Sequence, residues 1–194
     1  LSTRPGFRRL WLGGLVSLLG DWLSYVALSL LAIRHGGGAF ALALVFAGHV
    51  LPHAVMAPIA GVLADRLDKR RLLVAIEVAQ AAAVAAMIAA ALLPSIALVQ
   101  VLLFVRTGIG ALAYPTRQAA IRELVHDDEL VDANAIDAAT WSVAFALGTA
   151  LGGVVALAGT TVALGIDAVT FLIAGLIFAG MPSLAPGGRA SSFA

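Results

Sequence analysis

The chain has 194 residues, of which 61% are hydrophobic and only 12% are charged, and its mean hydropathy is +1.01. Soluble domains are usually about 45–50% apolar and about 25% charged, so a soluble fold of this size could not bury so much apolar surface. The net charge of +1 excludes a basic face for nucleic acid, and the absence of cysteine excludes disulfides and thiolate metal sites. An aromatic content of 7%, with abundant Ala, Leu, Val and Gly, favours membrane helices over an alternating β-barrel.

Six apolar stretches are long enough to cross a bilayer, because a hydrocarbon core of about 30 Å needs roughly 20 helical residues. The sequence therefore predicts an all-α membrane protein with transmembrane helices at about 10–33, 40–64, 72–93, 96–118, 134–157 and 161–181. The fourth span is the least regular, since Arg106, Arg117 and several glycines and prolines interrupt it. Residues 1–9 form the predicted N-terminal segment, and the Pro-, Gly- and Ser-rich residues 182–194 predict a flexible tail.

The orientation follows from where the Lys and Arg residues fall, because cytoplasmic loops are enriched in them. Ten of the twelve lie on one side of the predicted helices, while Arg34 lies on the other side and Arg106 within a span. We therefore expect both termini to be cytoplasmic, in a multi-pass protein of the cell inner membrane. The ten are Arg4, Arg8, Arg9, Arg66, Lys69, Arg70, Arg71, Arg117, Arg122 and Arg189.

Two opposite charges lie deep within the predicted spans, where each costs roughly 2.5–3.5 kcal/mol at mid-depth. Asp21 lies about 17 Å from the cytoplasmic edge and Arg106 about 15 Å from the outer edge, so the two reach nearly the same depth. Two interpretations stay open. Asp21 could carry protons in a cavity, with the charge of Arg106 adjusting the proton affinity of Asp21, or the two residues could form a static ion pair between two helices. Small and polar residues at helical spacing accompany them, namely Gly14, Ser17, Ser24 and Tyr25 near Asp21, and Gly110, Tyr114 and Arg117 after Arg106.

His49 and His53 lie four residues apart in the second span and therefore share one helical face. A proton relay, metal or haem ligation, and a structural role with backbone partners are the three interpretations. An isolated histidine pair is weak evidence for a metal, so we expect neither a metal nor a cofactor. Pro52 and Pro58 predict a kink in the same helix.

The remaining polar and small residues of the spans favour structural roles. Three further acids are expected to cap helices or to snorkel towards the membrane surface: Glu77, Asp137 and Asp167. Small residues recur every fourth position in the fifth span and predict close packing against another helix: Ala144, Gly148, Gly152 and Ala156, with Gly153 beside them.

The segment GVLADRLDKRR, residues 61–71, joins the second and third spans on the cytoplasmic side. Asp65 stands at the C-terminal end of a helix, where the negative end of the dipole makes a carboxylate unfavourable, so it needs a compensating partner. The segment resembles motif A of the major facilitator superfamily, a Gly-x-Leu-Ala-Asp-Arg-x-x-Lys/Arg-Arg loop at this same place. The match is carried by Gly61, Asp65, Arg66, Lys69, Arg70 and Arg71.

Other segments support the same resemblance. Arg106-Thr-Gly-Ile-Gly110 resembles the Arg-x-x-x-Gly element of the family's fourth helix, and Gly148-x-x-x-Gly152-Gly153 resembles its glycine-rich fifth-helix element. The stretch from Pro115 to Asn134, followed by GIDAVTFLIAGL, is similar to the branch that holds macrolide and enterobactin-type exporters.

The resemblance implies a six-helix half-bundle, itself a 3+3 inverted repeat, within a transporter of about twelve helices that works by alternating access. It implies that Asp65 contacts a helix of the second half. The expected function is proton-coupled efflux of small amphipathic compounds such as drugs or siderophores. The partners would be the lipid bilayer, the substrate, protons, and a C-terminal half or a second copy.

Two alternatives stay open: a transport-incompetent truncated or degenerate protein, and a six-helix unit that must dimerise to act. An enzyme is not expected, because the sequence has no nucleophile elbow, His-Glu-x-x-His motif or phosphate-binding loop.

Overall fold

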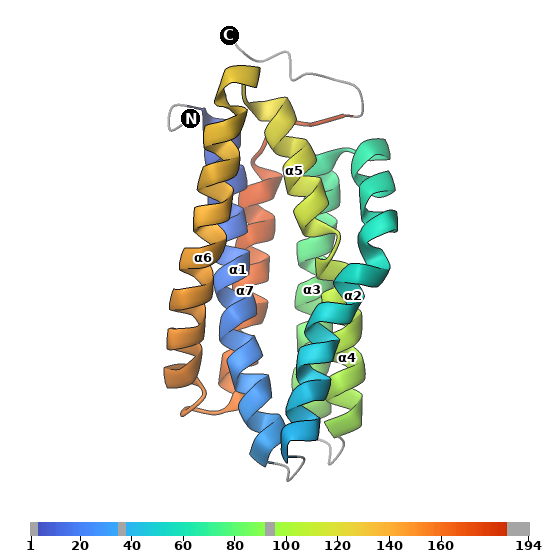
Figure 1. The fold of residues 1–194 in the computed structure, drawn as a ribbon, viewed down its shortest axis with the longest axis vertical. Coiled ribbons are helices and arrows are strands. Elements are labelled where there is room, and N and C mark those ends of the chain that lie inside the picture. Colours follow the sequence, from blue (N-terminus) through green and yellow to red (C-terminus); the bar gives the residue numbers. More distant parts are fainter. Residues whose placement is uncertain (1–3, 35–37, 92–95, 186–194) are drawn as a thin grey trace.

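The computed structural model describes residues 4–34, 38–91 and 96–185. These residues fold into an elongated bundle of roughly parallel and antiparallel helices (Figure 1). In chain order the elements are α1 (Pro5–Ala32), α2 (Gly38–Arg66), α3 (Lys69–Ala91), α4 (Ile96–Gly110), α5 (Ala113–Leu124), the 3-10 turn η2 (Asp127–Glu129), α6 (Leu130–Val155) and α7 (Thr160–Ala179).

The prediction of six membrane-crossing helices is confirmed for the part of the chain that the structure describes. Six helical segments there are long and apolar enough to cross a bilayer, with α4 and α5 together forming the fourth. Large apolar side chains cover much of the outside, as expected where lipid replaces water: Phe40, for example, is 74% exposed. The predicted end of the third helix at residues 92–93 lies outside the described residues.

The fourth span differs from the single helix predicted at 96–118. The structure breaks it at Ala111 and Leu112 and extends it to Leu124. The Leu112 amide donates to the carbonyl of Ile109, three residues back, at 3.2 Å, which tightens the chain into a turn. Pro115 has no amide hydrogen to donate to the carbonyl of Ala111, so the break falls where a helical hydrogen bond cannot form. The second span contains Pro52 and Pro58, and Figure 1 shows α2 changing direction along its length.

The helices pack in a fixed order that leaves a polar layer between two apolar ones. α7 packs against both α1 and α3, while α6 packs on α1 and α2 packs on α4. One apolar cluster surrounds Phe178 near the start of α1, and another surrounds Phe171 and Met87 towards the opposite end. Between these clusters the described helices carry buried polar side chains, so a central polar layer separates two apolar regions of the interior.

α1 begins and α7 ends at the same end of the bundle (Figure 1). Pro5 opens α1 within the segment that we predicted as a terminal extension, and proline is favoured at a first helical position. Residues 182–185 lie in the predicted flexible tail, yet Leu184 is only 1% exposed and its carbonyl accepts from the Lys69 amide at 3.1 Å. Residues 1–3 and 186–194 lie outside the described residues.

Candidate functional site

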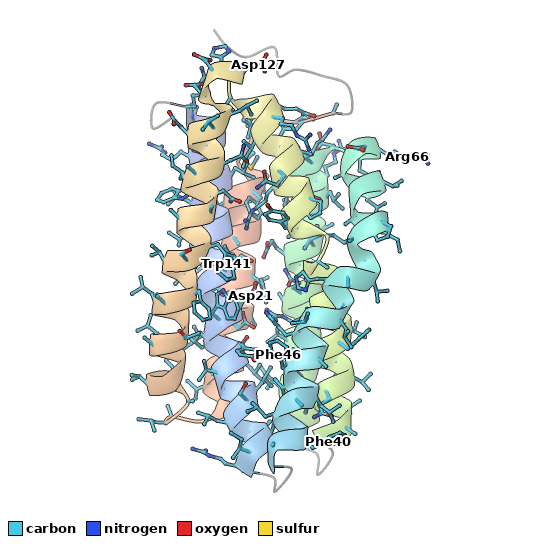
Figure 2. All side chains as sticks on the ribbon, viewed as in Figure 1. Asp21, Phe40, Phe46, Arg66, Asp127 and Trp141 are labelled. Atoms are coloured by element: carbon cyan, nitrogen blue, oxygen red, sulfur yellow. The ribbon has the colours of Figure 1, made fainter. Side chains whose placement is uncertain are left out.

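A cavity of about 830 Å³ occupies the polar layer and is lined by side chains from α1 to α6. Asp21 and Trp141 lie at mid-height in Figure 2, far from both Phe40 at one end and Arg66 and Asp127 at the other. The charged residues along its wall are Asp21, Glu77, Arg106, Arg117 and Asp137. The volume is that of a pocket for a small molecule, and its charges lie well inside the bundle.

Asp21 on α1 and Arg106 on α4 form an ion pair at the edge of this cavity. The Arg106 side chain is only 3% exposed, whereas that of Asp21 is 23% exposed. The aspartate is therefore the member of the pair that solvent in the cavity can reach. An accessible carboxylate held by a buried cation can exchange a proton while the cation stays in place.

Arg106 has a second acidic neighbour that the sequence analysis placed wrongly. Asp167 on α7 lies 3.6 Å from the Arg106 guanidinium, and its side chain is 1% exposed. It therefore does not snorkel to the membrane surface as we expected. The Phe171 ring, one turn further along α7, lies 5.0 Å from the same guanidinium, a cation–π distance.

Glu77 on α3 is also buried in the polar layer and does not reach the membrane surface. It is 1% exposed, and the hydroxyl of Ser17 on α1 donates to one of its carboxyl oxygens at 3.2 Å. Asp137 on α6 was likewise expected to cap or snorkel. It instead accepts from Arg117 at 3.0 Å and from Gln118 at 2.9 Å, which ties α6 to α5.

Periodicity would have revealed two of these three acids. Asp167 shares its helical face with Leu164, Phe171 and Ala174, all buried, and Glu77 shares its face with Leu73 and Val84. A carboxyl group on the most apolar face of a helix points into the bundle whatever its distance from the helix end. Depth along the helix alone does not reveal this orientation.

Aromatic rings form one wall of the site around His49. The His49 ring lies 5.3 Å from the Trp22 ring and 5.0 Å from the Tyr25 ring, and Trp22 also meets Trp141 edge-on at 5.7 Å. His53, whose ring nitrogen lies 2.9 Å from the carbonyl of His49, reaches the same cavity. Tyr114, which the sequence analysis grouped with Arg106, lines the cavity from α5 and is 58% exposed.

Among the described residues, no group of three His, Cys, Asp or Glu side chains is placed to hold a metal ion. The two histidines therefore lie with aromatic rings and a backbone carbonyl, away from any set of converging acidic ligands.

The loop that resembles motif A splits into an exposed part and a buried part. Asp65 and Arg66 are exposed at the end of α2, and a Cβ added at Gly61 would meet nothing within 4 Å. Lys69 is buried and pairs with Glu123 on α5 at 2.7 Å, while Arg70 donates to the carbonyl of Met181 at 3.2 Å. The exposed part is thus free for a neighbour, and the buried part fastens α3 to α5 and to the chain after α7.

Asp68, which we did not single out, caps the start of α3. Its carboxylate accepts from the Arg71 amide at 2.8 Å and from the Ser183 hydroxyl. Partial burial raises the pKa of Asp68, but the hydrogen bonds from Ser183 and the backbone outweigh it and hold the pKa below its ordinary value.

The small residues of the fifth span allow α6 to approach α1 closely. A Cβ on Gly148 would lie 3.0 Å from the carbonyl oxygen of Leu19, and one on Gly152 would lie 2.8 Å from that of Leu23. Ala144 is fully buried on the same face. Gly153 is not part of this contact, because a Cβ there would meet nothing within 4 Å.

Comparison of the sequence with known proteins identifies the family of this chain. The profile of the transmembrane secretion effectors of the major facilitator superfamily matches residues 3–182. The chain is 27% identical over 177 residues to the uncharacterized MFS-type transporter YfiS of Bacillus subtilis (strain 168). The match covers 91% of this chain and 40% of that relative, so the chain spans less than half of the relative's length. No solved structure matches the chain significantly.

Proposed function

The chain belongs to the transmembrane secretion effector family of the major facilitator superfamily, and from this premise we propose that it forms one half of a proton-coupled exporter of small amphipathic compounds. The observation that carries the proposal is the ion pair between Asp21 and Arg106, set in a cavity between two apolar layers. Ionisable groups at such a depth are costly and mark ion or substrate pathways in membrane proteins.

In the proposed mechanism a proton from the cavity binds the Asp21 carboxylate and removes its charge. The attraction between α1 and α4 then weakens, because Arg106 no longer faces an anion on α1. The two helices belong to different three-helix repeats of the half-bundle, so a change in their attraction favours one tilt of the repeats over another. Release of the proton on the other side of the membrane restores the pair and resets the bundle.

The aromatic wall supports the proposed class of substrate. Trp22 and Trp141 offer flat apolar faces beside the charged side chains, and the cavity volume of about 830 Å³ fits a drug-sized compound. A compound with both an apolar ring system and a polar or charged group can satisfy both kinds of surface at once. A purely polar solute would leave the aromatic wall without an apolar partner.

The proposed transporter needs a second six-helix bundle to close the cavity. Such a bundle would come from a longer form of this protein or from a second copy of the chain. The exposed Asp65 and Arg66 at the end of α2 would contact that bundle and stabilise one of the two access states. The clustering of Lys and Arg at this end of the molecule supports a cytoplasmic location for it, in an inner-membrane protein.

The test is the uptake of ethidium and a panel of neutral amphipathic dyes into inverted membrane vesicles that hold the protein and are energised to build a pH gradient, because export from the cytoplasmic face fills the lumen of such vesicles. The proposal predicts dye movement that stops when a protonophore collapses the gradient. Movement that survives the protonophore would contradict proton coupling. The absence of movement for every dye would favour the alternative of a transport-incompetent six-helix protein.

A further inference from the structure

Arg106 is the buried cation of the polar layer, and two carboxylates from two different helices approach it. Asp21 comes from α1 and faces the cavity, whereas Asp167 comes from α7 and its side chain is only 1% exposed. With all three groups ionised, this cluster on three helices carries one positive and two negative charges. A static lock between two helices would need only one acid for one base, so the second carboxylate calls for a separate role.

We propose that Asp167 is the second counter-ion of Arg106, a positioning residue that holds the guanidinium when Asp21 binds a proton. This inference rests on the proposed function, because it explains how proton binding can occur without leaving a bare cation inside the bundle. With Asp21 ionised, the three groups carry a net charge of −1. When a proton from cavity water forms an O–H bond on Asp21, the net charge becomes zero, and Arg106 with Asp167 remains a neutral pair.

The energetic reason is the cost of an unpaired buried charge. Breaking a buried ion pair by removing one partner typically costs about 3–5 kcal/mol, because the other charge stays desolvated. If Arg106 depended on Asp21 alone, each proton that neutralised Asp21 would carry that cost. Asp167 removes it, since its oxygen lies 3.6 Å from the guanidinium and a small side-chain movement closes the distance.

The surroundings of Asp167 keep it ready for this role. The Phe171 ring on α7 lies 5.0 Å from the guanidinium and places an apolar face against it. Gly20 on α1 leaves the space that the Asp167 carboxyl fills, because a Cβ there would lie 2.7 Å from its oxygen. The other titratable or charged groups that line the cavity beside this centre are His49 and His53 on α2, Glu77 on α3, Tyr114 and Arg117 on α5 and Asp137 on α6.

The first test is the pH profile of ethidium efflux for the wild-type protein, Asp167→Asn and Asp167→Glu. Without the charge of Asp167, Arg106 pairs with Asp21 alone and Asp21 takes up a proton less readily. We expect the midpoint of the profile of Asp167→Asn to move to lower pH by about one unit, the usual size of a neighbouring-charge effect. Asp167→Glu keeps the charge and should keep the midpoint. An unchanged midpoint in Asp167→Asn would overturn the inference.

The second test does not depend on transport, so it separates the inference from the proposed function. Melting temperatures at neutral pH are compared for Asp21→Asn, Asp167→Asn and the double variant in detergent. Either single variant leaves Arg106 one anion, and only the double variant leaves none, so the double loss should exceed the sum of the single losses. If the double variant lost only the sum of the two single losses in melting temperature, the inference would be overturned. It would also be overturned if Asp167→Asn alone failed to accumulate in the membrane, because this variant should keep Asp21 as the partner of Arg106. Asp137→Asn combined with Asp21→Asn is the control and should be additive, because Asp137 pairs with Arg117.

Discussion

Two charged clusters of this molecule differ in how they match anions to cations. The central cluster, Asp21, Arg106 and Asp167, places two carboxylates around one guanidinium between apolar layers. The end cluster, at the start of α3, matches each charged group to a fixed partner: Lys69 to Glu123, and Asp68 to a backbone amide and Ser183.

The ratio of anions to cations distinguishes a cluster that holds helices together from one that can change its pairing. In the end cluster no partner is in excess, and several partners are backbone groups that cannot move independently. The end cluster therefore holds α3, α5 and the chain after α7 together. In the central cluster one cation can shift between two anions, and only one of these anions faces the cavity. Proton binding there redistributes a charge without breaking the bundle.

The largest expected effect is on transport, which should depend on the central cluster and not on the end cluster. Asp21→Asn removes the accessible carboxylate and should abolish proton-driven efflux. Insertion into the membrane should stay intact, because Arg106 still has Asp167 as a counter-ion. Asp68→Asn is the matched change in the end cluster and should retain most of the efflux. Dye uptake into inverted vesicles, scaled to the amount of inserted protein, gives both values. Wild-type rates in Asp21→Asn would remove the central cluster from the mechanism.

A pair of glycine substitutions tests the space around each cluster. Gly20→Ala should destabilise the protein by about 1–3 kcal/mol, because its Cβ would meet the Asp167 carboxyl and Thr170 on α7. Gly61→Ala lies near the end cluster with no atom within 4 Å, and should be neutral or up to about 1 kcal/mol stabilising, since alanine favours a helix. Thermal unfolding in detergent measures both changes. Equal effects at the two sites would contradict the close approach of α1 and α7.

Removing Lys69 tests whether the end cluster holds α3 to α5. Its side chain is 4% exposed and that of Glu123 is 16% exposed, so Lys69→Gln leaves a partly buried carboxylate without its cation. We expect a loss between the ~1 kcal/mol of an exposed pair and the ~3 kcal/mol of a buried one. Adding Glu123→Gln should recover part of this loss. A double variant that is less stable than Lys69→Gln would show that the two side chains do not act as a pair.

The smallest effect concerns the cap of α3. Ser183→Ala removes one hydrogen bond, so we expect a loss of about 1 kcal/mol at neutral pH. Because the folded pKa of Asp68 lies below its ordinary value of 3.8, its contribution is full above that value and is lost as the pH falls through the folded pKa. Ser183→Ala should raise this pKa and move the acid loss of stability to higher pH. Acid unfolding curves that coincide for the two proteins would contradict the cap.

The sequence predicted the number of crossing helices because hydropathy depends only on composition and length, which lipid constrains directly. Counting residues from the span ends placed Asp21 and Arg106 at similar depths, and the structure joins them in an ion pair. Asp167 was missed because depth says nothing about the face that a residue occupies. The break at Ala111 was also not predicted. It depends on the missing amide hydrogen of Pro115 and on the hydrogen bond from the Leu112 amide to the Ile109 carbonyl, which the sequence pattern does not show.

The packing of the chain after α7 also could not be predicted from local sequence. Residues 182–185 look like a flexible segment by composition, but they lie against the start of α3 through contacts more than 100 residues apart in the chain. Such long-range contacts leave no periodic pattern in the sequence. The roles proposed for Asp65 and Arg66 stay predictions, since both are exposed in this half-bundle.

The central claim is that Asp21 exchanges protons inside the bundle, and carbodiimide labelling tests it most directly. Dicyclohexylcarbodiimide reacts with protonated carboxyl groups in apolar surroundings, and mass spectrometry of the peptide that contains Asp21 locates the adduct without need of a substrate. The account predicts labelling of Asp21 that rises as the pH is lowered and disappears in Asp21→Asn. Labelling of Asp21 that is absent, or that does not change with pH, would contradict it.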